Sequence, residues 1–184
     1  MIFLYKNIKI CLILLAGYIL CADVGQAAGR VKVRYPQPAS PLSLECVMDA
    51  AQRNALPPAA LLGILATEGG QPGEALSNTN GTWDIGPFQI NTCHMGELAK
   101  LGVRPVSLMA DSCLNAAAAA WLLRKELNRS RDIWEAVGAY HSRTPRFHYA
   151  YIARVQRNLV ALREDTRRVH RLIEYANGQR RGWK

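Results

Sequence analysis

Paired helix-start and helix-end signals between Leu44 and Leu162 constrain the fold of this chain more than any other feature. Pro57-Pro58 suits the opening turn of a helix, and Gly69-Gly70 is a common way to end one. Comparable signals recur along the rest of this stretch. They predict six helices, at about 44–54, 58–68, 93–102, 112–127, 133–140 and 145–162.

The segments outside these helices differ from them in composition. Residues 71–91 are rich in Gly, Pro and Asn, which predicts a long loop or a minimal β-hairpin of the kind that often carries function. Residues 28–43 contain three prolines and no periodicity, and we interpret them as a flexible leader. Residues 163–184 are rich in Arg and are interpreted as a basic C-terminal tail. The sequence therefore predicts one mainly α-helical domain over 44–162.

The N-terminus has the pattern of a secretory signal peptide. Lys6 and Lys9 precede the uncharged run Ile10–Ala22, which is shorter than the ~20 residues of a membrane-spanning helix. Small residues follow, and cleavage is expected near Ala27. The pattern predicts a signal peptide over 1–27, export to the periplasm and no stable membrane span after cleavage; the alternative is an uncleaved anchor.

The composition restricts the partners without choosing among them. Apolar residues make up 49 %, enough to bury a core, and the formal net charge is +9. A basic surface favours nucleic acid, a membrane surface or an acidic polymer. Because the chain is expected to be exported and has no recognisable nucleic-acid motif, we expect no nucleic-acid partner. The Arg-rich tail is interpreted as a solvated helix face, with attraction to cell-wall polymer or docking to a secretion partner as functional alternatives.

Glu68 is out of place on its predicted helix. It falls on the same face as Leu61, Ile64 and Leu65, and it ends the helix, where the macrodipole disfavours negative charge. Both burial and the dipole raise the pKa of a carboxyl group there. A carboxyl group that stays protonated near neutral pH can donate a proton to a leaving oxygen. The alternative is a side chain that turns into solvent.

Two later motifs add groups that suit a sugar site. Gln89 follows a tight turn in the stretch 81–91, and Tyr140 ends the fifth predicted helix. An acid, an amide and a phenol around a loop-lined cleft provide the donors, acceptors and ring faces that sugars need.

These motifs together resemble the soluble lytic transglycosylase family of the lysozyme-like superfamily, over residues 46–155. The family has a catalytic Glu, a Gly-Leu-Met-Gln-Ile turn and an Ala-Tyr-Asn motif. The corresponding segments of this sequence are 67–70, 86–90 and 139–141, in that order. The chain departs from the pattern at Gly69, at Pro87-Phe88 and at His141. These variants resemble the branch carried by conjugation and type IV secretion systems.

The resemblance implies a lysozyme-like fold, α+β with a minimal β or loop element, and cleavage of peptidoglycan between N-acetylmuramic acid and N-acetylglucosamine. Glu68 would be the single catalytic acid and base, and Tyr140 would orient the substrate's N-acetyl group or Glu68. No metal or cofactor is needed, and the chain would act as a monomer with possible partners in a secretion apparatus. The implied substrate-binding residues are Gln89, Tyr140, Ile90, Trp83 and Phe88.

The cysteines leave several pairings open. If the signal peptide is removed, Cys46, Cys93 and Cys113 remain, and an oxidising compartment favours one disulfide and one free thiol. The resemblance implies the pair Cys46–Cys113, with Cys93 free.

Asp84 keeps a second chemistry open. If it faced the cleft it could activate water, which would make the protein a hydrolytic lysozyme; the favoured interpretation is an Asx interaction within its turn. A third hypothesis is a wall-binding assembly module without turnover. The four histidines lack the spacing of a zinc site. The sequence leaves open which secretion system is served and whether action is endo or exo.

Overall fold

The computed structural model describes residues 10–13, 19–22, 30–165, 167–179 and 182. The predicted signal peptide and its cleavage near Ala27 lie mostly outside these residues. Of that segment the structure describes β1 (Ile10–Ile13) and β2 (Ile19–Ala22), which pair in antiparallel fashion.

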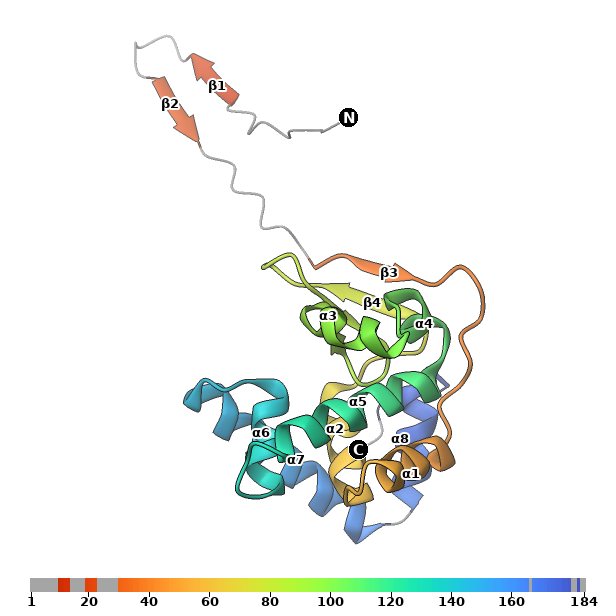
Figure 1. Cartoon of the computed structure of the whole chain (residues 1–184). Coiled ribbons are helices and arrows are strands. Elements are labelled where there is room, and N and C mark those ends of the chain that lie inside the picture. Colours follow the sequence, from red (N-terminus) through yellow and green to blue (C-terminus); the bar gives the residue numbers. More distant parts are fainter. Residues whose placement is uncertain (1–9, 14–18, 23–29, 166, 180–181, 183–184) are drawn as a thin grey trace.

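The domain is mainly helical with one small antiparallel sheet, as predicted (Figure 1). The sheet has the order β3-β4-β5-β6 and lies above the helices in the view of Figure 1. Its pairs are in register at Val33–Ala75, Leu76–Asp84 and Ile85–Ile90. Its strands are β3 (Lys32–Arg34), β4 (Glu74–Ser77), β5 (Trp83–Ile85) and β6 (Ile90–Asn91).

The helices include those that the capping signals predict. Ser43, Asp111 and Asp132 cap helices with their side chains, each accepting from a backbone N–H of the first turn. The longer helices are α1 (Leu44–Arg53), α2 (Pro58–Glu68), α5 (Ser112–Leu127), α6 (Ile133–His141), α7 (Pro145–Glu164) and α8 (Arg167–Ala176).

The third predicted helix, 93–102, is broken into short pieces. They are η1 (Thr92–His94), α3 (Met95–Leu98) and η2 (Ala99–Leu101), and a further short helix, α4 (Pro105–Ala110), was not predicted. Gly102, at a positive φ of 77°, ends this run as the sequence indicates.

Close packing brings α2 and α7 side by side. Gly63 of α2 faces α7, and a Cβ there would lie 2.8 Å from Val155 and 2.9 Å from Leu159. Asn158 of α7 donates a hydrogen bond to the Thr67 hydroxyl at 2.9 Å. These contacts fix the end of α2, which carries Glu68, against the long helix.

The alanine-rich helix α5 lies at the centre of the helical part and packs against α1, α4 and α6. Small side chains allow this close approach from several directions. The buried alanines of the run are Ala116, Ala118, Ala119 and Ala120.

The structure differs from the interpretation of 28–43 as a flexible leader. Within its described part, β3 pairs with β4, and Leu42 is only 2 % exposed. The Asn177 side chain donates to the Leu42 carbonyl and accepts from the Leu42 N–H. This order comes from pairing with distant segments, which local periodicity does not report.

The interpretation of 163–184 as a tail outside the domain is likewise wrong for α8. Leu172 is fully buried, Ala176 is nearly so, and α8 packs against α2 and α7. Arginines dominate the composition of this segment and obscure its short apolar stripe. Arg168 and Arg171 pair with Glu164 and Asp165 at the junction of the two helices.

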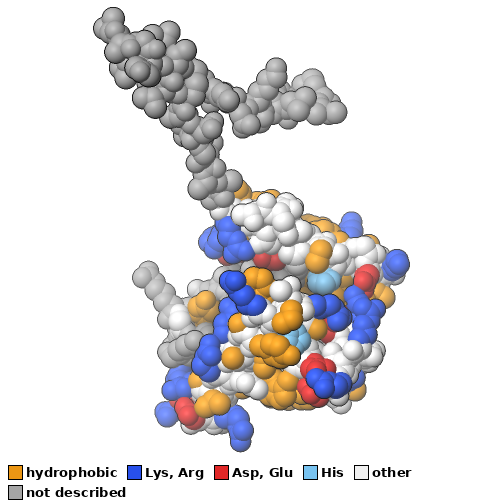
Figure 2. Space-filling view, turned by 90° about the vertical axis from the view of Figure 1, so that its left-hand side faces the viewer, with side chains coloured by type: hydrophobic (Ala, Val, Ile, Leu, Met, Phe, Trp, Pro, Cys, Tyr) orange, Lys and Arg blue, Asp and Glu red, His pale blue; other side chains and the backbone are white. Residues whose placement is uncertain are grey.

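Charged side chains border the face shown in Figure 2, where Lys and Arg lie toward both edges and hydrophobic side chains gather between them. No helix among the described residues is long and apolar enough to cross a membrane.

Candidate active site

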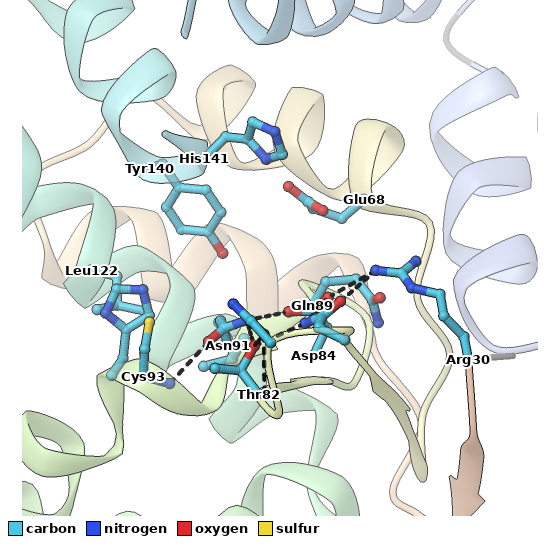
Figure 3. Close-up of a pocket in the computed structure, with 14 residues that line it drawn as sticks. Arg30, Glu68, Thr82, Asp84, Gln89, Asn91, Cys93, Leu122, Tyr140 and His141 are labelled. Atoms are coloured by element: carbon cyan, nitrogen blue, oxygen red, sulfur yellow. Dashed lines mark hydrogen bonds and ion pairs between the residues drawn. The ribbon is translucent and has the colours of Figure 1, made fainter. Parts of the chain in front are cut away.

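A cavity of about 420 Å³ lies between the sheet and the helices α2 and α6 (Figure 3). Polar side chains dominate its wall, which suits a ligand with many hydroxyl and amide groups. Its lining residues are Arg30, Glu68, Asn78, Asn80, Thr82, Asp84, Gln89, Ile90, Asn91, Cys93, His94, Leu122, Tyr140 and His141.

Glu68 is the last residue of α2, and its side chain is half-buried in this cavity. Gly69 caps the helix in the left-handed conformation, with φ 64°, so the chain turns away directly after the acid. Burial raises the pKa of Glu68 to about 7, and the negative charge of Asp84 adds to the rise. Glu68 therefore holds its proton into the neutral range, as its place on the helix predicted.

Tyr151 of α7 is the hydrogen-bond partner of Glu68, with its hydroxyl 2.5 Å from Glu68 Oε1. The ring of His141 stacks on Tyr151 with centroids 4.5 Å apart, and the Arg154 guanidinium lies 5.3 Å from the ring centre. The hydrogen bond and the charge of Arg154 both lower the pKa of Glu68, against the larger effect of burial. The site thus balances opposing influences on one carboxyl group.

The turn before Gln89 is held from two sides. The buried Asn115 accepts from the Phe88 N–H at 3.0 Å and donates to the Ile85 carbonyl at 2.9 Å. On the other side Gly70 lies so close that a Cβ would overlap the Gly86 carbonyl oxygen and the Gln89 amide. Only glycine fits at 70, because the turn and the end of α2 are in direct contact.

Gln89 has a positive φ of 49° and directs its side chain into the cavity (Figure 3). Its Nε2 donates to the Gly86 carbonyl at 3.0 Å. A non-glycine residue in this conformation carries strain that the surrounding contacts must hold in place. The amide oxygen makes no hydrogen bond within the described residues, so it is available to a ligand in the cavity that Gln89 lines.

Asp84 lies across the cavity from Glu68 in Figure 3. Asn78 Nδ2 donates to Asp84 Oδ2 at 2.9 Å, and Asn91 Nδ2 donates to Oδ1 at 2.7 Å. Arg30 lies 3.7 Å from the same carboxylate. Both oxygens are therefore held by side chains from the sheet and its loops. The predicted Asx interaction within 83–86 is wrong, because Asp84 lies in strand β5 and the Gly86 N–H donates to the Glu74 carbonyl at 2.8 Å.

The structure brings four of the predicted site residues to the cavity and leaves two away from it. Glu68, Gln89, Ile90 and Tyr140 line the wall. The Tyr140 hydroxyl donates to the Phe88 carbonyl at 3.1 Å, and the hydrogen bond to Glu68 comes from Tyr151 instead.

Phe88 and Trp83 do not line the cavity. The Phe88 side chain is 0 % exposed within the core, so the prediction that it contacts substrate is wrong for the side chain. Trp83 is half-buried against the core and is not among the residues that line the cavity.

The residues missed by the sequence interpretation are Tyr151 and the amides around Asp84. Tyr151 falls at helical spacing with Val155, which predicts a core residue, and it is indeed buried. Helical spacing predicts that the side chain is buried, but it does not predict which group the Tyr151 hydroxyl contacts. The many Asn residues in 78–91 indicated turns, and the same residues supply the amide donors that surround Asp84.

Cys46 and Cys113 form a disulfide between α1 and α5, as the resemblance implied. Cys93 is a free, exposed thiol at the cavity wall. Burial raises the pKa of this thiol, with Asp84 adding to the rise, so it stays protonated near neutral pH. In the part of the chain that the structure describes, no group of three His, Cys, Asp or Glu side chains could hold a metal ion.

Comparison with known families matches residues 45–150 to the Transglycosylase SLT domain. The chain belongs to this family. The matched residues run from α1 into α7 and include Glu68, the turn at Gln89 and Tyr140. SLT family membership agrees with the mainly helical, lysozyme-like architecture of the described domain.

Curated relatives of this SLT-family chain include proteins of Salmonella, Shigella and Escherichia coli. It is 36 % identical over 74 residues to "Invasion protein IagB" of Salmonella typhimurium, covering 40 % of this chain and 46 % of that protein. It is 35 % identical over 101 residues to "Protein IpgF" of Shigella flexneri, covering 54 % and 66 %. It is 30 % identical over 95 residues to "X polypeptide" of Escherichia coli (strain K12), covering 52 % of this chain and 53 % of that protein. The chain thus spans about half the length of the curated relatives it matches.

Proposed function

We propose that this protein is a lytic transglycosylase that cleaves the β-1,4 bond between N-acetylmuramic acid and N-acetylglucosamine in peptidoglycan and leaves a 1,6-anhydromuramyl end. The observation that carries the proposal is Glu68, a carboxyl group with a pKa raised to about 7 at the wall of a polar cavity. Membership of the SLT family supports the same chemistry.

In this mechanism protonated Glu68 first donates its proton to the glycosidic oxygen as the bond breaks. The substrate's own N-acetyl group stabilises the positive charge at the anomeric carbon, as in substrate-assisted glycosidases. Glu68, now a carboxylate, takes the proton of the muramyl 6-hydroxyl, whose oxygen closes the anhydro ring. The pKa near 7 suits both steps, because neither form of Glu68 is strongly favoured in the neutral range.

Gln89 and Tyr140 are proposed to bind the sugar beside Glu68, with Ile90 providing apolar surface. Tyr151 would keep the Glu68 carboxyl group in one orientation through both steps, since its hydroxyl donates to Oε1. The residues of the wall supply these contacts without a metal or cofactor.

A hydrolytic lysozyme is the second candidate, and the position of Asp84 favours it. Asp84 lines the same cavity as Glu68, where a second carboxylate could activate water. Against this, both of its oxygens already accept hydrogen bonds from Asn78 and Asn91. A wall-binding module without turnover is the third candidate, and it leaves the raised pKa of Glu68 unexplained.

The proposed setting is the periplasm, with local opening of the wall for a conjugation or type IV secretion machine. The signal-like segment 1–27 and the disulfide Cys46–Cys113 support export. The Glu-Gly-Gly and Tyr-His-Ser variants of the motifs support the secretion context through the resemblance.

The test is release of soluble muropeptides from purified peptidoglycan. The mature chain is expected to release them, and Glu68→Gln, which keeps the size and an acceptor for Tyr151, is expected to release none. Equal release by the two proteins, or none from a folded wild type, would contradict the proposal.

A further inference from the structure

Arg154 places a positive charge at the edge of the site. It lies three residues after Tyr151 on α7, and its guanidinium carbon is 5.3 Å from the centre of the Tyr151 ring. The hydroxyl of that ring is bonded to Glu68. One side chain, Tyr151, therefore connects this charge to the catalytic acid. The charge lowers the pKa of both Glu68 and His141.

The guanidinium has no acidic partner among the described residues, where its recorded contact is with the Tyr151 ring. Arg30, the other arginine near the acid, differs in this respect because it contacts Asp84 and Asn78. Arg154 is exposed and does not itself line the cavity, so it remains open to a ligand that extends past the cavity wall.

An arginine in this place is suited to bind carboxylate. Its planar fork of N–H donors matches a carboxylate in bidentate geometry, and the ring beneath it limits the orientations that the fork adopts. The neighbouring Glu68 does not neutralise it below about pH 7, because burial keeps Glu68 protonated there.

We propose that Arg154 binds a carboxylate of the glycan substrate and so selects acidic muramyl strands over neutral ones. The inference rests on the proposed function. Peptidoglycan offers such a group from two sources: the stem peptide, or the lactyl group of muramic acid where the peptide has been removed.

The competing explanation is that the guanidinium only covers the Tyr151 ring and adjusts the charge on Glu68. In that case its loss would affect every substrate equally. The two explanations separate when the carboxylates of the substrate are removed and the glycan is kept.

The experiment compares Arg154→Gln with wild type on soluble uncross-linked strands and on the same strands with their carboxyl groups converted to amides. Arg157→Gln is the matched control, since Arg157 is an exposed arginine one turn further along α7 with no recorded pairing among the described residues. We expect Arg154→Gln to lower kcat/KM about tenfold on acidic strands, mainly through KM, as for loss of a charge-assisted hydrogen bond. On amidated strands we expect it to match wild type, and Arg157→Gln to match wild type on both.

A third substrate identifies the source of the carboxylate. Strands stripped of peptide by an amidase keep only the lactyl carboxylate, which is bound in an amide on peptide-bearing strands. A tenfold loss confined to the stripped strands therefore assigns the lactyl group, and a loss confined to peptide-bearing strands assigns the stem. An equal loss on acidic and amidated strands, or no loss on peptide-bearing and stripped strands alike, overturns the inference. Failure of wild type to cleave any strand contradicts the proposed function instead, so the two failures are distinguishable.

Discussion

The Tyr151 hydroxyl donates a hydrogen bond to Glu68 Oε1 at 2.5 Å and so joins the middle of α7 to the end of α2. The two residues are 83 positions apart in sequence. The acid is thus held by a helix that follows all the residues of the cavity wall in the sequence. Its ionisation and its orientation depend on α7 as well as on its own helix.

Tyr151→Phe tests this link. The phenol lowers the pKa of Glu68, so its removal is expected to raise that pKa and move the alkaline limb of the activity profile to higher pH. The carboxyl group also loses its fixed orientation, and we expect kcat to fall about tenfold. The measurement is a pH profile of muropeptide release.

Tyr140→Phe is the comparison for that profile, because the Tyr140 hydroxyl donates to the Phe88 carbonyl and not to Glu68. It is expected to weaken sugar binding and to leave the alkaline limb where it is in wild type. A shift of the limb in Tyr140→Phe, with none in Tyr151→Phe, would reverse the roles assigned to the two phenols.

The raised pKa of Glu68 also affects stability. The folded state holds the proton up to about pH 7, whereas the unfolded chain loses it near 4.5, so the free energy of unfolding falls as pH rises through this window. Glu68→Gln lacks this fall. At each pH the free energy of unfolding of wild type is subtracted from that of Glu68→Gln. This difference is expected to be about 1–3 kcal/mol more favourable to the variant at pH 8 than at pH 4.

Urea unfolding of both proteins at the two pH values measures this difference. A constant difference between them would mean that Glu68 titrates at its ordinary pKa in the folded protein. The acid would then be ionised throughout the neutral range, which would remove the main support for its role.

Gly70→Ala tests the contact between the end of α2 and the turn before Gln89. A Cβ would overlap the Gly86 carbonyl oxygen, so one of the two segments must move. We expect a loss of about 1–3 kcal/mol in stability and a larger proportional loss in activity. Gly96→Ala is the control, because a Cβ there meets open space. If both variants behave like wild type in unfolding and activity assays, the contact does not position the site.

The disulfide Cys46–Cys113 closes a loop with a sequence separation of 67 between two packed helices. Replacing both cysteines with serine is expected to lower the free energy of unfolding by about 2–4 kcal/mol. Chemical denaturation of the variant and of wild type, both without reductant, gives the value. An unchanged midpoint and slope would show that the link adds nothing to the packing of α1 against α5.

The sequence predicted the elements whose signals are local. Pro57-Pro58 and Gly69-Gly70 mark the ends of α2 within a residue, and the side-chain caps at Asp111 and Asp132 mark α5 and α6. Glu68 could be singled out because its conflict with the helix end is visible in the sequence alone.

The parts that escaped prediction depend on contacts between distant segments. Residues 32–34 form a strand only because β4 is there to pair with them, and α8 is held in the domain by Leu172 and by the Asn177–Leu42 hydrogen bonds. Tyr151 shows the same limit within the site, since helical spacing predicts that it is buried and cannot predict what its hydroxyl touches.

The mass of the muropeptides released by the mature chain tests the central claim most directly. A single acid acting without water is expected to give anhydromuramyl products, about 18 Da lighter than the products of hydrolysis. These products should be absent with Glu68→Gln and still present with Asp84→Asn. Hydrated reducing ends that disappear with Asp84→Asn would contradict the account and make the protein a two-carboxylate lysozyme.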